Sequence, residues 1–296
     1  MATVTETQEL HFPVSGMPTF NFTGSATDIR ITAGTDDAVH VHITKKATAA
    51  TEERARAMLE RGEIHSDQAG NTITVIVKER HDISFNWGKW GASSQILVVV
   101  TAPAATNLRL RQNSGGAEVV GISGGLEIDL NSGDLVMREA RIGTPAKLAL
   151  NSGDMQLHAL TFTDDARVEV NSGNMRLADV TFGGSVHFTV NSGNLHMDQV
   201  TLADAVTLEV NSGDAAGAIT FIEKGSLVGN INSGNAHLTL PSTTDAFVSA
   251  TLLAGDVRVT GFPHEKTRHG AVATAPQAAH LLRFRVSAGD VRVTAR

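Results

Sequence analysis

The sequence predicts an all-β protein: a parallel β-solenoid (β-helix) with coils of about 20 residues, preceded by a β-rich N-terminal cap with one α-helix. Three observations predict this fold class. The tripeptide Asn-Ser-Gly recurs seven times, with a spacing of 20 residues from Asn131 to Asn211. Apolar and polar residues alternate on both sides of each copy. Small turns such as Gly183-Gly184 separate one copy from the next.

The copy around Asn171 shows how one coil is built. Val168 and Val170 alternate with charged residues before the tripeptide, and Met175 and Leu177 alternate with Arg176 after it. A period of two is typical of a strand with one buried face. We expect about three short strands in each coil, separated by corners. A single coil has no partner face for its apolar row, so the coils must stack to bury it.

The Asn-Ser-Gly corner has a structural interpretation. Glycine permits the positive φ that a tight corner needs. The asparagine amide can both donate and accept, so stacked copies can hydrogen-bond to one another. We therefore predict a structural corner ladder of asparagine side chains: Asn113, Asn131, Asn151, Asn171, Asn191, Asn211 and Asn232.

The repeat resembles a known bacterial family. Units such as residues 151–157 (NSGDMQL), and the strand with Pro-Ala entry at residues 100–103 (VTAP), are similar to a β-strand-repeat family whose members are described as candidate adhesins of unknown function. The resemblance covers roughly residues 20 to 296. It implies the solenoid fold, and it implies no catalytic residues.

The N-terminal cap region is expected to span residues 1–104. Residues 1–20 read as an extended lead-in, and residues 28–42 as a degenerate first coil. A helix is predicted at residues 51–63, because Thr51 can cap it and acidic residues fill its first turn. We expect this helix to cover the open end of the solenoid, whose strand edges would otherwise be unpaired.

The solenoid repeats are expected to span residues 105–296. A loop insertion at about residues 261–279 interrupts them, because Pro263 and Pro276 break the strand pattern. Residues 281–294 then restore the alternation and predict the last coil.

A binding candidate lies in the cap region. Trp87, Lys89 and Trp90 stand in a glycine-bearing segment that contains both tryptophans of the chain. Loops carry binding residues more often than their share, and tryptophan is enriched at binding hot spots. Two interpretations stay open: the rings pack on the cap, or they contact a protein partner or a glycan.

Composition and charge indicate which classes of partner the protein can have. The chain has a net charge of −7 and no cysteine, but its C-terminal part is net basic, since residues 257–296 carry seven basic and two acidic side chains. This distribution favours self-association or a protein partner and argues against nucleic acid. No apolar run is long enough to span a membrane, and residues 1–20 do not look like a signal peptide. We expect a cytoplasmic protein, with export by a non-classical route as the alternative.

Catalytic and metal-binding patterns are weak. Asp129, Glu169 and Glu209 stack at intervals of two coils, about 9.6 Å from the strand spacing, at the upper edge of the separation in inverting glycosidases. Asp134 and Asp154 follow corner glycines and could share a calcium ion, although such residues more often bond to backbone. We expect no catalytic residues, no metal site and no cofactor. The sequence therefore predicts a non-enzymatic structural or interaction protein, with a self-assembling scaffold as the leading hypothesis. An adhesin-like or carbohydrate-binding module is the alternative, and a polysaccharide hydrolase or lyase is the weaker one.

Overall fold

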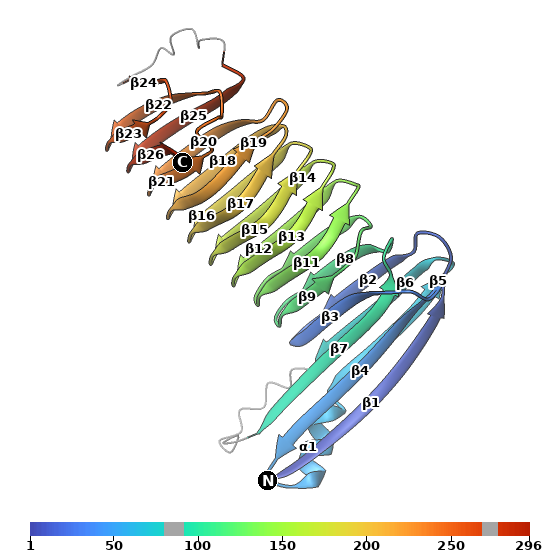
Figure 1. Cartoon of the computed structure of the whole chain (residues 1–296). Helices are drawn as coiled ribbons and strands as arrows, with labels where there is room; N and C mark the ends of the chain where they lie inside the picture. The colour runs from blue at the N-terminus through green and yellow to red at the C-terminus, as the bar shows by residue number, and fades with distance from the viewer. Residues whose placement is uncertain (80–91, 268–277) are drawn as a thin grey trace. The chain divides into compact units, whose positions relative to one another are not determined.

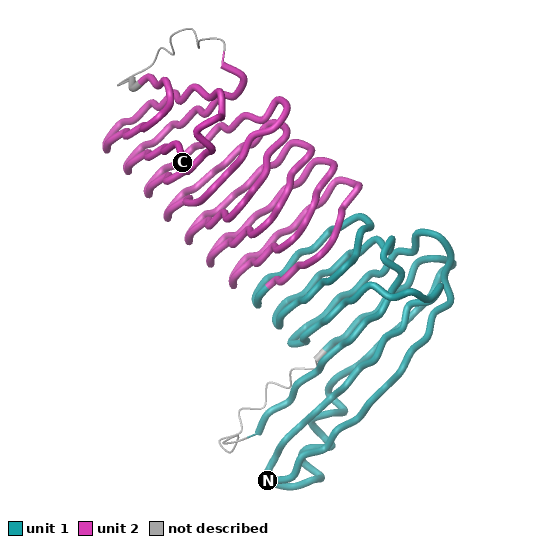
Figure 2. The backbone as a smooth tube through the Cα atoms, viewed as in Figure 1, with its two compact units in different colours: residues 1–134 teal, residues 135–296 magenta. Residues whose placement is uncertain are grey.

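The protein is described by a computed structural model that covers residues 1–79, 92–267 and 278–296 (Figure 1). The chain forms two compact units, residues 1–134 and residues 135–296 (Figure 2). Parallel strands stack into successive coils, so the predicted β-solenoid fold is confirmed.

Unit 1 contains ten strands and one helix in its described residues. In one sheet the order is β1-β4-β7-β3-β9, and in the other it is β10-β8-β2-β6-β5. In chain order the elements are β1 (Ala2–Pro13), β2 (Thr19–Gly24), β3 (Thr27–Gly34), β4 (Ala38–Ala49), α1 (Glu52–Leu59), β5 (Gly62–Ala69), β6 (Thr72–Glu79), β7 (Ser93–Pro103), β8 (Asn107–Gln112), β9 (Ala117–Val120) and β10 (Leu126–Leu130).

The N-terminal residues differ from the prediction. The expected lead-in over residues 1–20 instead contains β1, which pairs antiparallel with β4 along its whole length, from Ala2 opposite Ala49 to Pro13 opposite Ala38. The expected first coil over residues 28–42 is also wrong in part. β3 does join the parallel coils, but β4 turns back and runs antiparallel to β7. Alternation reveals a buried face but not the direction of the strand.

Helix α1 lies where the sequence predicts a helix, but it ends at Leu59, four residues before the expected end at position 63. The Thr51 hydroxyl accepts a hydrogen bond from the Arg54 backbone N–H at 3.3 Å. Ala55 and Leu59 are buried against Ala47 and Ala49 of β4. The helix ends early because Gly62 already begins β5, which forms a hairpin with β6.

Unit 2 contains sixteen strands in its described residues. The sheet orders are β11-β13-β15-β17-β19-β21-β26-β23 and β24-β22-β25-β20-β18-β16-β14-β12. In chain order the strands are β11 (Leu135–Ile142), β12 (Ala146–Ser152), β13 (Met155–Phe162), β14 (Ala166–Ser172), β15 (Met175–Phe182), β16 (Val186–Ser192), β17 (Leu195–Leu202), β18 (Ala205–Ser212), β19 (Ala215–Phe221), β20 (Ser226–Ser233), β21 (Ala236–Leu240), β22 (Ala246–Ala254), β23 (Val257–Thr260), β24 (His264–Thr267), β25 (His280–Ala288) and β26 (Val291–Ala295).

Each regular coil of unit 2 has two strands, not the three that the sequence predicts. The two apolar pairs after the corner, such as Met175 with Leu177 and Val180 with Phe182, belong to one strand, β15. Asp179, between them, has a positive φ of 54°. This single residue returns the apolar side chains to the buried face without ending the strand. The equivalent residues of neighbouring coils, Ala159 and Gln199, have φ values of 52° and 54°.

The core of unit 2 lies between its two sheets. Buried residues stack in register along β12, β14, β16 and β18 as the ladder Leu148, Val168, Phe188 and Leu208. Phe162 and Phe182 stack with ring centroids 5.0 Å apart, and Phe188 meets Phe182 edge-on at 5.3 Å. Because Phe182 and Phe188 belong to different sheets, this contact links the two faces of the core.

The last coil in the sequence is not the last coil in space. β25 and β26 lie between β20–β21 on one side and β22–β23 on the other (Figure 1). The chain therefore builds the coil β22–β23, and the short strand β24 beyond it, before it inserts the final coil. The sequence predicts the strands of this coil but not its position.

Candidate functional site

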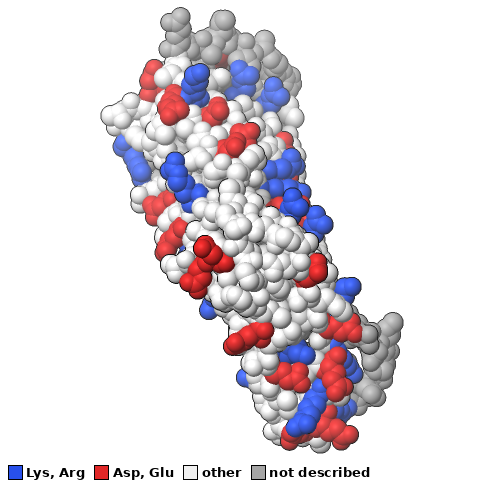
Figure 3. Space-filling view, turned by 90° about the vertical axis from the view of Figure 1, so that its right-hand side faces the viewer, with Lys and Arg blue, Asp and Glu red and all other residues white. Residues whose placement is uncertain are grey.

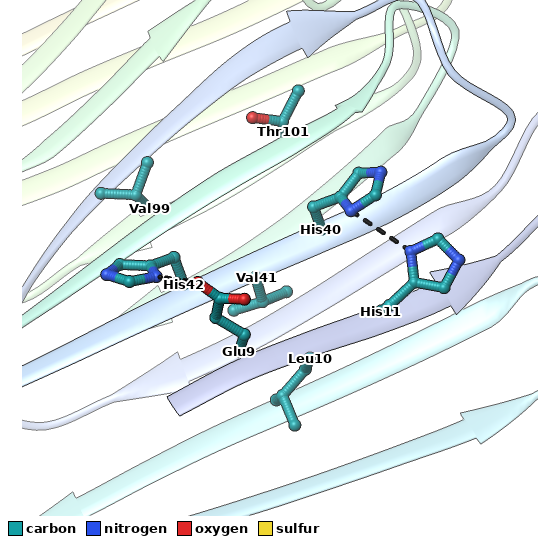
Figure 4. A pocket seen from close by; sticks show the side chains of 8 residues that line it. All are labelled: Glu9, Leu10, His11, His40, Val41, His42, Val99 and Thr101. Atoms are coloured by element: carbon teal, nitrogen blue, oxygen red, sulfur yellow. Dashed lines mark hydrogen bonds and ion pairs between the residues drawn. The ribbon is translucent and has the colours of Figure 1, made fainter. Parts of the chain in front are cut away.

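A groove with a volume of about 510 Å³ lies on unit 1, over strands β1, β4 and β7 (Figure 4). Its side chains form two rows across the sheet, as the strand register requires. His11, His40 and Thr101 lie opposite one another in one row. The second row has Glu9, His42 and Val99, so the groove gathers three imidazoles and one carboxylate on one face.

Strand alternation explains this arrangement. His40 and His42 are two residues apart on β4, so both point into the groove, while Val41 between them is buried on the other face. Leu10 similarly points away from the face that bears Glu9 and His11 (Figure 4). The apolar faces of β1 and β4 are thereby turned toward the core.

The histidine pair defines one end of the groove. The Nδ1 atoms of His11 and His40 are 3.2 Å apart, and the two ring centroids are 4.7 Å apart at an angle of 49°. One ring must carry its proton on Nδ1 and donate it to the unprotonated Nδ1 of the other ring. The other nitrogen of the His40 ring, Nε2, lies 3.6 Å from the Asp36 carboxylate.

Glu9 and His42 form the other end of the groove. His42 Nδ1 lies 3.4 Å from Glu9 Oε1, and both side chains are well exposed to solvent. A surface pair of this kind contributes about 0–1 kcal/mol to stability. The groove is therefore an accessible polar site on a rigid sheet.

The predicted binding residues Trp87, Lys89 and Trp90 lie outside the described residues. The predicted corner asparagines lie within them, and several are joined by hydrogen bonds. In unit 1 the Asn131 amide donates to the Asn113 carbonyl at 2.9 Å. In unit 2 the same contact runs from each asparagine to the preceding one, over Asn151, Asn171, Asn191, Asn211 and Asn232.

A second ladder runs beside the first one. At several corners, the side chain of the residue after the glycine accepts a hydrogen bond from the backbone N–H of its counterpart in the neighbouring coil. Asp154 Oδ1 accepts from the Asn174 N–H at 2.8 Å, and Asp214 Oδ1 accepts from the Asn235 N–H at 2.9 Å. This is the backbone role that the sequence offers as the alternative to calcium. Among the described residues, no group of three or more His, Cys, Asp or Glu side chains is arranged to hold a metal ion.

Two of the stacked carboxylates considered for glycoside hydrolysis, Glu169 and Glu209, contact a basic side chain. Glu169 accepts a hydrogen bond from Arg167, two residues earlier on β14. Glu209 Oε2 lies 3.7 Å from His187 Nε2 on the neighbouring strand β16. Glu169 is therefore a member of a surface ion pair, and Glu209 is one when His187 is protonated.

Charges of both signs are interspersed on the face shown in Figure 3, on each of the two units. Arg30 and Glu118 in unit 1, for example, form an ion pair at 2.7 Å.

Within the described part of the chain, no helix has the length and apolar character needed to cross a lipid bilayer.

Sequence reasoning missed the histidine groove. His11 and His40 are 29 residues apart, and they meet only because β1 pairs with β4. The local signal was His40-Val41-His42, since two histidines two residues apart on a strand share a face. The prediction of an extended lead-in over residues 1–20 does not supply their partners, because it gives those residues no strand to pair with.

Comparison with proteins of curated function finds no match. Solved structures similar to this chain include a candidate adhesin from Bacteroides fragilis NCTC 9343, with a TM-score of 0.44, 11% identity and 97% of each chain covered. A candidate lipid-binding protein from Parabacteroides distasonis ATCC 8503 has a TM-score of 0.33 and 13% identity, and the match covers 97% of this chain and 96% of that one. A candidate cell adhesion protein from Clostridium sporogenes ATCC 15579 has a TM-score of 0.30 and 10% identity over 100% of both chains. The model of the family described as Toastrack DUF4097 matches residues 20–294, and the chain therefore belongs to the Toastrack family.

Proposed function

We propose that this protein is a non-enzymatic interaction scaffold that associates with other copies of itself through free strand edges. The observation that carries the proposal is the length of β1: twelve residues that, among the described residues, pair with β4 alone. An unpaired strand edge presents backbone N–H and C=O groups that can accept another strand.

The side chains of β1 favour strand addition in part of its length. Thr3, Thr5 and Thr7 have high β-propensity and are exposed. The acidic residues Glu6 and Glu9 already face Lys45 and His42 of β4, at 3.1 and 3.4 Å. Lys45 therefore balances the charge of Glu6 within the sheet, and His42 does the same for Glu9 when it is protonated, which reduces the repulsion between two copies that would meet edge to edge.

The test is the mass of the full chain, measured by light scattering over a concentration series. We expect the mass to rise with concentration, and the double variant Thr5→Lys/Thr7→Lys to remain a monomer, because lysines on an edge strand oppose its pairing. The matched control is Gln156→Lys/His158→Lys, which adds lysines with the same spacing to exposed positions of β13. Since β13 is paired on both edges, the control should associate like the unaltered protein.

Two results would contradict self-assembly through β1. One is a monomer at every concentration, and the other is association that the Thr5→Lys/Thr7→Lys variant leaves unchanged. Negative-stain images of the same samples would show whether the assemblies are discrete oligomers or filaments.

The alternative is an adhesin-like, carbohydrate-binding function, which one feature of the sequence supports. Trp87 and Trp90 are the two tryptophans of the chain, with Lys89 between them, and the chain has no tyrosine. Tryptophan fluorescence therefore reports on this segment alone. A glycan that stacks on these rings should change the emission, and Trp87→Ala/Trp90→Ala should abolish retention on the same immobilised glycan. Unchanged retention would exclude these residues as the glycan contact.

A further inference from the structure

We propose that His11 and His40 bind one divalent transition-metal ion through their Nδ1 atoms. The two residues lie directly opposite each other on neighbouring strands, so the sheet itself holds both rings. Their Nδ1 atoms converge to 3.2 Å. With metal–nitrogen bonds of about 2.05 Å, two ligand nitrogens are about 3.3 Å apart in a tetrahedral site and about 2.9 Å apart at neighbouring positions of a tetragonal site. The pair is therefore already spaced as two metal ligands are.

Asp36 also supports metal binding through Nδ1, because it lies beside the other nitrogen of the His40 ring. Its carboxylate lies 3.6 Å from His40 Nε2 and favours the tautomer with the proton on that nitrogen. His40 Nδ1 is then unprotonated and free to coordinate. In the metal-free protein His11 donates its Nδ1 proton to this atom, and on binding the metal His11 takes the other tautomer, with its proton on Nε2.

The surroundings leave the remaining coordination positions open. The pair faces the groove, the His40 side chain is 44% exposed, and no third ligand is in place among the described residues. Water fills the other positions, which makes this an exchangeable site and not a closed structural one. Two imidazoles select late first-row ions, with Cu²⁺ bound more tightly than Ni²⁺, while Ca²⁺ and Mg²⁺ prefer oxygen ligands.

The test is calorimetric titration of the full chain with Cu²⁺ and with Ni²⁺, after removal of any histidine tag. We expect one ion per chain and tighter binding of Cu²⁺, with no binding of Ca²⁺. His11→Gln and His40→Gln should each weaken binding by more than about 100-fold, because loss of a supporting residue alone costs about 10–100-fold. Asp36→Asn, which removes such a supporting residue, should weaken it by about 10-fold.

The matched control is His65→Gln. His65 is an exposed histidine of β5 in the same unit, and its nearest ion-pair partner is Glu63, at 3.8 Å. This variant should bind the ions as the unaltered chain does. Circular dichroism should show that all variants keep their strands, since the substituted side chains are at the surface.

A second readout identifies the coordinating atoms. Zn²⁺ titration followed by nitrogen-15 NMR should shift the Nδ1 resonances of His11 and His40 and leave those of His65 in place. Unchanged Cu²⁺ affinity in a His11→Gln/His40→Gln double variant would overturn the proposal. An equal loss in His65→Gln would do so too, because the chain has twelve histidines that could bind copper without a built site.

Discussion

At the scale of single residues, the corner glycines are required by close approach as well as by backbone angle. Gly173 has a φ of +136°, and a Cβ added there would lie 1.8 Å from the carbonyl oxygen of Gly153 in the preceding coil. The same clash recurs at Gly193, Gly213 and Gly234. The corners thus stack so tightly that any side chain would push two coils apart.

Gly173→Ala should therefore lower the free energy of unfolding by about 2–4 kcal/mol, from backbone strain and overpacking together. Gly70→Ala is the control. Gly70 also has a positive φ, +60°, but nothing lies within 4 Å of its added Cβ, so we expect a cost of about 1 kcal/mol. Chemical unfolding of both variants checks this. Equal costs would mean that the close approach at the corner does not limit stability.

At the scale of the element, the left-handed residue within each long strand decides how many strands a coil has. The sequence predicts a break after Leu177, because the period of two fails there. The strand continues instead, because the positive φ of Asp179 returns the apolar side chains to the buried face and the backbone pairing of β15 resumes beyond it. The helix shows the same limit, because its start was predicted from Thr51 but its end was set by the pairing of β5 with β6.

Ala159 offers a direct test of the role of the residue with positive φ within these strands. Ala159 has a φ of 52°, which is costly for alanine, whereas Ala178 in the next strand is not among the residues with positive φ. We expect Ala159→Gly to be more stable than Ala178→Gly by about 1–2 kcal/mol, because only the first relieves backbone strain. Thermal unfolding compares the two variants. The idea fails if the same substitution destabilises both sites equally.

At the scale of the whole molecule, the inserted final coil is the main topological feature of unit 2. Phe284 of this coil is fully buried and lies in register with Gly229 on one side and Ala250 on the other. A Cβ on Gly229 would come within 2.7 Å of the Phe284 ring. Gly229 and Ala250 leave room for the large Phe284 ring, so the complementary volumes of these residues favour this order of the coils.

A double-mutant cycle tests that order. Gly229→Val should destabilise the protein by about 1–3 kcal/mol through overpacking, and Phe284→Val should reverse part of this loss, with a coupling of about 1–3 kcal/mol. Gly229→Val combined with Leu148→Val is the control, because β12 and β20 are separated by β14, β16 and β18. The control pair should be additive to within about 0.5 kcal/mol. Additivity of Gly229 with Phe284 would show that β25 does not neighbour β20.

The repeat, the all-β class, the coil length and the start of the helix follow from the sequence alone. They depend on local periodicity and on residues such as Asn171 and Thr51, whose preferences act over a few positions. Tertiary structure alone decided the pairing of β1 with β4, the insertion of β25–β26 and the meeting of His11 with His40. These depend on contacts between residues far apart in the chain, and a pattern with period two states which face of a strand is buried without naming the strand beside it.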